Sequence, residues 1–95
     1  MPKAVVVGDT GTDHNGYPPT SVTAGSGTVK IDHRPAARLG DPLAQHDKPK
    51  HPPHPRTIAS GSGSVLIDGK PAAVTGSRIS CGGVTIGSAS VNIGG

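Results

Sequence analysis

The sequence is poor in the residues that usually build a hydrophobic core. It has no phenylalanine or tryptophan and only one tyrosine, and valine, isoleucine and leucine together make up 18 of its 95 residues. It also has no glutamate and only one cysteine. A helical bundle is excluded, because it requires leucine, alanine, glutamate and lysine at helical spacing. A membrane-spanning helix is excluded because no apolar run approaches about 18 residues. The single cysteine excludes an internal disulfide.

Glycine and proline are abundant instead, with 15 and 10 residues. We expect one domain over residues 1–95, and a domain of this size buries little apolar surface. It therefore needs a cross-link such as a bound metal ion, a repeat architecture or a binding partner to be stable. Its five histidines make a metal ion the first of these to consider. The net charge of +3 is dispersed and has no aromatic platform beside it, so we expect no nucleic-acid partner.

The chain repeats itself. Residues 25–41 align with residues 61–77 at a shift of 36 positions, and 10 of the 17 aligned residues are identical. A third, truncated copy occupies residues 87–95, and its missing half resembles residues 5–9. The sequence thus predicts three similar units, one of them split between the two ends. Three copies imply approximate threefold symmetry, and the split places the termini near each other.

Each unit has the local pattern of a β-hairpin. A Val-x-Ile triplet places two apolar side chains on one face of a strand, and this triplet recurs at residues 29–31, 65–67 and 91–93. Asp32-His33 and Asp68-Gly69 follow the first two triplets, as two-residue hairpin turns do. The prolines after these turns suit edge strands. We expect an all-β fold with almost no helix.

Each unit also delivers one metal-binding side chain after the same turn. His14 and His46 are each the fifth residue after a Gly-Asp pair, and Cys81 is the fourth after a Gly-Ser pair. In a threefold arrangement these three side chains converge on the axis. The longest connector adds His51 and His54 as candidates for a fourth ligand. We favour His54 because it adjoins the segment where the next strand is expected; the sequence leaves open whether His51 replaces His54 or His46.

Three histidines and one cysteine suit one tetrahedral zinc ion. Four protein ligands make a closed, structural site with no open position for water, and zinc-coupled folding contributes roughly 10–16 kcal/mol in zinc-finger peptides. The competing interpretation of Cys81 is a buried structural thiol, since a catalytic thiol would need a base and a cleft. His33 lies in a predicted hairpin turn, where we expect an exposed side chain.

These residues carry a family resemblance. Residues 35–38 read Pro-Ala-Ala-Arg, and residues 71–74 are a degenerate second copy, Pro-Ala-Ala-Val. Together with the Gly-Asp and Gly-Ser pairs and the terminal Asn-Ile-Gly, they make the whole chain resemble a PAAR-repeat protein. The second copy departs from the pattern, because Val74 stands where the first has Arg38 and Ser77 where the first has Asp41. An ion pair between Arg38 and Asp41 would therefore be missing from the second unit.

The resemblance implies a fold and a function. It implies a small, sharp cone of short strands with pseudo-threefold symmetry and a zinc ion near the apex. Such a cone caps the trimeric VgrG spike of the type VI secretion system, one monomer per trimer, and sharpens it for puncturing target membranes. We expect no fused effector domain and no signal peptide; assembly is expected in the bacterial cytoplasm, followed by translocation without stable membrane insertion.

Two alternatives differ from this interpretation. A zinc-dependent hydrolase would need an open metal position and a general base, whereas the chain has no glutamate and its aspartates stand mostly in turn motifs; we therefore expect no enzyme activity. The second alternative is an adaptor that carries a non-covalently bound effector and does not puncture the target membrane. It differs from the spike tip only in its binding partners. The sequence does not specify which VgrG is bound, whether an effector is carried, or which cell is the target.

Overall fold

The computed structural model describes residues 2–13, 15–48 and 51–94, which form antiparallel strands and turns without a helix. Within these ranges there is accordingly no helix long and apolar enough to cross a membrane. The strands are β1 (Thr10–Gly11), β2 (Thr20–Ser21), β3 (Lys30–Ile31), β4 (Arg34–Pro35), β5 (Pro42–Lys48), β6 (His51–Thr57), β7 (Leu66–Ile67), β8 (Lys70–Pro71) and β9 (Thr85–Ile86). They pair as a β2-β1-β9 sheet and as the hairpins β3-β4, β5-β6 and β7-β8.

A closed ring of three backbone hydrogen bonds joins the three units. The amide of Ala37 donates to the Val5 carbonyl (2.9 Å), that of Val5 to the Ala73 carbonyl (3.1 Å), and that of Ala73 to the Ala37 carbonyl (3.0 Å). The three residues hold the same place in their units and are all buried. The ring agrees with the expected pseudo-threefold symmetry, and in it Val5 takes the place that Ala37 and Ala73 take in the other two units.

The turn that follows this ring is also repeated in each unit. A side-chain oxygen accepts the amide hydrogen of the residue three positions earlier, which closes the turn. The three bonds run from Val6 to Asp9 (2.9 Å), from Arg38 to Asp41 (2.8 Å) and from Val74 to Ser77 (3.0 Å). The Ser77 hydroxyl thus makes the same contact as the two carboxylates, which explains why the second unit tolerates serine there.

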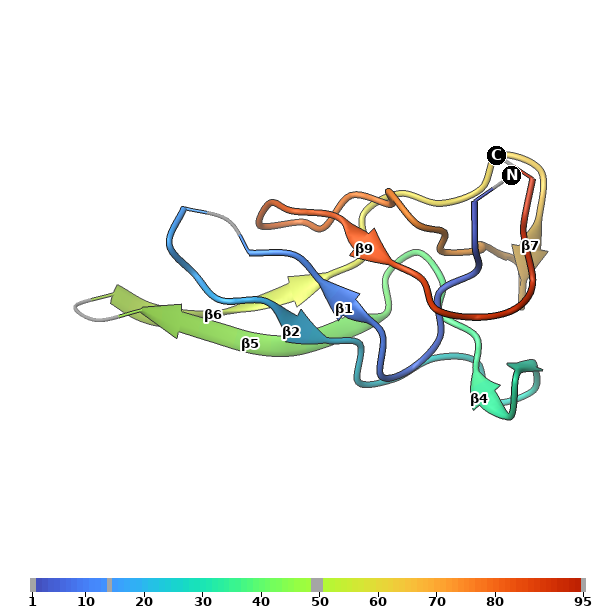
Figure 1. The fold of residues 1–95 in the computed structure, drawn as a ribbon, viewed down its shortest axis with the longest axis horizontal. Helices are drawn as coiled ribbons and strands as arrows, with labels where there is room; N and C mark the ends of the chain where they lie inside the picture. Colours follow the sequence, from blue (N-terminus) through green and yellow to red (C-terminus); the bar gives the residue numbers. More distant parts are fainter. Residues whose placement is uncertain (1, 14, 49–50, 95) are drawn as a thin grey trace.

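The two shorter hairpins, β3-β4 and β7-β8, lie with both termini at one end of the molecule, which we call the wide end (Figure 1). Their turns have positive φ at both central residues, 53° and 68° at Asp32 and His33, and 54° and 78° at Asp68 and Gly69. That backbone is typical of two-residue hairpin turns, so the predicted hairpins are confirmed. His33 is exposed, as expected.

The third unit is completed by the two ends of the chain. The Ile93 amide donates to the Pro2 carbonyl (2.8 Å), and Lys3 and Asn92 form a β-bridge. The Val-x-Ile pattern is only partly obeyed here, because Ile93 is buried but Val91 remains 45% exposed. The two ends are neighbours, as the split repeat predicts (Figure 1).

Side-chain hydrogen bonds link neighbouring units at the wide end. In each link, hydroxyl groups of one unit donate to the residue that follows the Val-x-Ile triplet of another. The links are Ser26 (2.5 Å) and Thr28 (2.6 Å) to the Asp68 carboxylate, Ser90 to the Asp32 carboxylate (2.7 Å), and Ser62 to the Gly94 carbonyl (2.5 Å). A main-chain carbonyl therefore replaces the carboxylate where the third unit has glycine.

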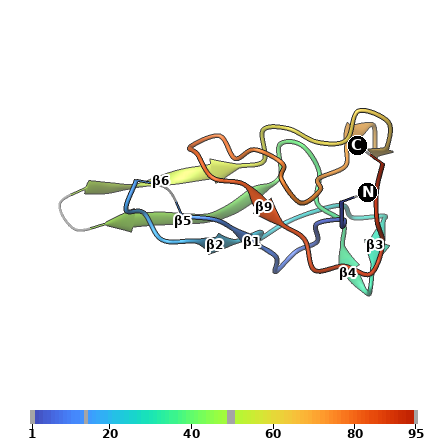
Figure 2. The same ribbon diagram turned by 45° about the horizontal axis from the view of Figure 1, so that its top comes forward.

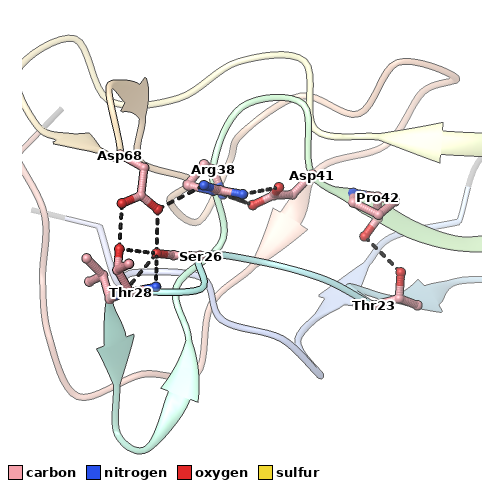
Figure 3. Close-up of polar contacts among 8 residues, drawn as sticks. Thr23, Ser26, Thr28, Arg38, Asp41, Pro42 and Asp68 are labelled. Carbon is pink, nitrogen blue, oxygen red and sulfur yellow. Dashed lines mark hydrogen bonds and ion pairs between the residues drawn. The ribbon is translucent and has the colours of Figure 1, made fainter.

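Arg38 adds charge to one of these links (Figure 3). Its guanidinium donates to Asp41 at 2.9 Å and to Asp68 at 2.9 Å, and the pair with Asp41 has no counterpart at Val74 and Ser77. The hydrogen bonds with Asp41 raise the pKa of Arg38. The hydroxyls of Ser26 and Thr28 lower the pKa of Asp68, with a further contribution from Arg38.

A carboxylate pKa is also lowered at the link between Ser90 and Asp32. Ser90 lowers the pKa of Asp32 through hydrogen bonds from its hydroxyl and its amide. Both carboxylates are thus held in the charged form by donors from another unit. Two of the three links at the wide end are therefore charge-assisted hydrogen bonds.

The core consists of small residues in two clusters. One lies at the wide end and contains Ala4, Val6, Ala36, Ile67, Ala72, Val74, Ala89 and Ile93. The other contains Val5, Val22, Ala37, Leu43, Ile58, Ala73 and Ile79, with Cys81 packed against it. Alanine and valine allow the backbones to approach closely around the axis. The absence of phenylalanine and tryptophan is therefore consistent with a body that is only 22 Å across and 40 Å long.

The β5-β6 hairpin extends farthest from the wide end, and we call its outer end the narrow end (Figures 1 and 2). The sequence predicts a long connector here, with the next strand beginning only beyond His54. That expectation was wrong, because β6 begins at His51 and pairs with β5 across two register irregularities. Prolines are tolerated at open strand edges and at bulges, and both register irregularities lie along this hairpin.

Candidate metal centre

Two of the candidate ligands meet between the β5-β6 hairpin and the loop that precedes β9. The sulfur of Cys81 lies 3.6 Å from Nε2 of His46. His46 is on β5 and its side chain is only 2% exposed, whereas Cys81 is half-buried. The residues come from different units, as convergence of the repeats requires.

The imidazole of His46 is held in a defined orientation. Its Nδ1 lies 2.9 Å from the carbonyl oxygen of Pro18. A carbonyl can only accept, so Nδ1 carries the hydrogen and the Nε2 lone pair is directed at Cys81. The ring of Tyr17, the only aromatic residue of the chain apart from the histidines, lies over it with centroids 4.8 Å apart. A carbonyl contact at the rear nitrogen is typical of metal-binding histidines.

The separation of the two atoms fits a tetrahedral zinc ion. With zinc–sulfur and zinc–nitrogen distances of about 2.3 and 2.05 Å and a tetrahedral angle, two ligand atoms stand about 3.6 Å apart. The Cys81 Sγ to His46 Nε2 distance is 3.6 Å. These two residues therefore fit two corners of one zinc tetrahedron.

The other candidates are placed less completely. His14 lies outside the described residues, two positions beyond Thr12. The backbone of His54 is paired with that of His46, and the backbone of His51 is paired with that of Lys48, nearer the narrow end; the side chains of His51 and His54 lie outside the described part. Among the side chains that are described, no group of three histidine, cysteine or acidic residues is close enough to hold a metal ion.

Sequence reasoning missed one residue beside this pair. Arg56 on β6 is 1% exposed, and its Nε donates to the Cys81 sulfur at 3.3 Å. Its only signal in the sequence is an arginine at the end of a proline-rich run, which gives no indication of burial. The contact between the Pro18 carbonyl and His46 was also missed, because it joins positions 28 residues apart and leaves no local signal in the sequence.

The class of protein is defined by these features together. Three quasi-equivalent β-units surround one axis, their hairpins form a wide end, and a histidine and a cysteine from different units adjoin farther along the molecule. A family model described as the PAAR motif matches residues 7–87. The chain therefore belongs to the PAAR motif family, and the resemblance seen in the sequence is confirmed. A comparison with curated proteins found no match.

Family membership carries a general functional assignment. The PAAR motif is associated with the tip of the type VI secretion spike, and the family is a structural one that associates with VgrG and generally binds a metal ion. The all-β structure agrees with that class.

Proposed function

We propose that this protein caps the blunt end of a trimeric VgrG spike, one monomer per trimer, and acts as its membrane-puncturing tip. The observation that supports this most directly is the closed hydrogen-bonded ring of Val5, Ala37 and Ala73. It gives a single chain three similar faces about one axis, so the chain can contact three identical subunits at once. Assembly takes place in the bacterial cytoplasm and is followed by translocation, and effectors can attach to the same protein without being fused to it.

The wide end is the surface that meets the trimer. Its hairpins are only two strands wide, so each exposes backbone groups that can pair with strands of a partner. Leu66 on β7 is 61% exposed and Val91 is 45% exposed at this end. Apolar side chains beside open strand edges suit a β-structured partner better than solvent.

Binding of the wide end is tested with two matched substitutions. Leu66→Asp is expected to abolish co-purification of the chain with the VgrG trimer, because it places a charge in the interface. Ile86→Asp is the control, since Ile86 is 50% exposed on β9, away from the wide-end hairpins. If wild-type protein does not bind the trimer, or if both variants bind as wild type does, this assignment of the interface is wrong.

The same proposal assigns one structural zinc ion to His14, His46, His54 and Cys81. The ion would join segments of all three units and stiffen the part of the molecule that leads into the membrane. Two features of the chain prepare these ligands: the Pro18 carbonyl orients the His46 ring, and the pairing of β5 with β6 places His46 opposite His54. A closed set of four ligands leaves no position for a reacting water, so no catalytic activity is proposed.

The metal assignment is tested by measuring zinc per chain. Wild-type protein is expected to contain one zinc ion, and His54→Ala and Cys81→Ser are expected to lose it. His51→Ala is the matched control for His54→Ala, because both residues lie on β6. Retention of zinc by His54→Ala together with its loss from His51→Ala would replace His54 with His51 in the ligand set.

A further inference from the structure

Arg56 is a buried charge without an acidic partner among the described side chains. All five of its N–H groups are used: Nε donates to Cys81, Nη1 to Gly11 and Thr20, and Nη2 to Thr12 and Gly82. The ion pairs of the described residues all involve Arg38. Burying a guanidinium without a negatively charged partner is costly even when all of its N–H groups are hydrogen-bonded. The buried position of Arg56 therefore requires a reason beyond packing.

The acceptors belong to the segments that surround the candidate metal centre. Nη2 lies 2.6 Å from the carbonyl of Thr12, two residues before His14, and 3.2 Å from that of Gly82, which follows Cys81. Nη1 lies 3.0 Å from the Thr20 hydroxyl. Arg56 itself lies on β6, the partner strand of β5. One rigid fork therefore fixes the loop after β1, the start of β2 and the loop before β9 relative to the β5-β6 hairpin.

Four of the five acceptors are neutral oxygens, and the fifth is the Cys81 sulfur. We propose that Arg56 is a positioning residue of the metal centre, which sets the Cys81 sulfur and the segment leading to His14 in place before a metal ion binds. Such contacts behind the ligands determine metal affinity because the ligand atoms need not be reordered when the ion arrives. This proposal rests on the zinc site proposed above.

Two substitutions separate positioning from charge. Arg56→Gln removes the charge, whereas Arg56→Lys keeps the charge but cannot reproduce the planar arrangement of five N–H donors. Positioning predicts weaker zinc binding in both variants, whereas an effect of charge alone predicts that Arg56→Lys binds zinc as wild-type protein does.

The experiment uses the full chain with Zn²⁺ in competition with a chelator and the visible spectrum of bound Co²⁺. Arg56→Lys and Arg56→Gln are expected to bind Zn²⁺ about 10–100-fold more weakly and to show shifted or weakened Co²⁺ bands, because the sulfur is displaced. Thr20→Val removes one acceptor of the guanidinium and should weaken binding about fivefold. Arg38→Gln is the control for general destabilisation; it should lower the melting temperature and leave the Co²⁺ spectrum unchanged.

Wild-type affinity and spectrum in Arg56→Lys and Thr20→Val would overturn the proposal, as would tighter binding in Arg56→Gln. If the Arg56 variants do not fold, Thr20→Val decides, because it removes a single hydrogen bond. Failure of wild-type protein to bind zinc would overturn the metal centre and the positioning role together. Zinc binding that is unaffected by these substitutions would overturn the positioning role alone.

Discussion

Within a unit, the glycine of the Gly-Ser pair packs closely against the backbone of the Pro-Ala-Ala segment. A Cβ atom added at Gly61 would lie 2.7 Å from the Ala72 carbonyl oxygen and 2.9 Å from Cβ of Pro71. Neither atom can move by rotating a side chain, and the same carbonyl accepts the Ser62 amide at 2.8 Å. Gly25 has the same environment, 2.6 Å from the Ala36 carbonyl oxygen. We therefore expect Gly61→Ala to force these two segments of the unit apart.

Overpacking of this kind costs about 2 kcal/mol. For a domain of this size, that loss lowers the melting temperature by about 8–16 °C. Gly27→Ala is the matched control, because no atom lies within 4 Å of its added Cβ and its φ is not positive. That variant should melt at or slightly above the wild-type temperature, since alanine restricts the unfolded chain. Thermal unfolding followed by circular dichroism measures both, and equal melting temperatures for the two variants would refute the close packing of Gly61 against Pro71 and Ala72.

Three further outcomes are expected. Adding a chelator should lower the melting temperature of wild-type protein but not that of Cys81→Ser; a chelator effect of the same size in both would contradict a structural zinc ion. Arg38→Gln should lower the melting temperature by about 4–8 °C, the contribution of about one hydrogen bond, and an unchanged value would show that its ion pairs are not stabilising. The lowered pKa of Asp68 contributes stability that is complete above its ordinary value of 3.8 and is lost as the pH falls through the folded-state pKa. The difference in melting temperature between wild type and Asp68→Asn should therefore narrow in acid, and a constant difference would contradict this linkage.

The symmetry of the fold could be predicted from sequence because it is encoded locally. Each unit repeats its own turn residues, and a two-residue turn such as Asp68-Gly69 determines a hairpin without reference to the rest of the chain. The split of the third unit followed from the same comparison of residues. Even the substitution at Ser77 keeps its contact, because a hydroxyl accepts the same amide hydrogen as a carboxylate.

The features that could not be predicted depend on contacts between distant segments. The prolines around His54 indicate a loop when read alone, and only their place in a two-stranded ribbon makes a strand possible. The burial of Arg56 is likewise invisible in sequence, because its acceptors are mostly backbone carbonyls of other units. His46 and Cys81 were predicted as candidates from repeat spacing, whereas the Pro18 carbonyl that orients His46 carries no sequence signal.

The completion of one unit by both ends of the chain has a consequence for folding kinetics. Val5 can enter its ring only with Ala73, and Pro2 can pair only with Ile93. During synthesis Pro2 and Val5 must therefore wait until residues 73–93 have been added before their partners exist. Contacts between such distant positions are typical of slowly folding topologies, so we expect the domain to assume its native structure only after residue 93 has left the ribosome.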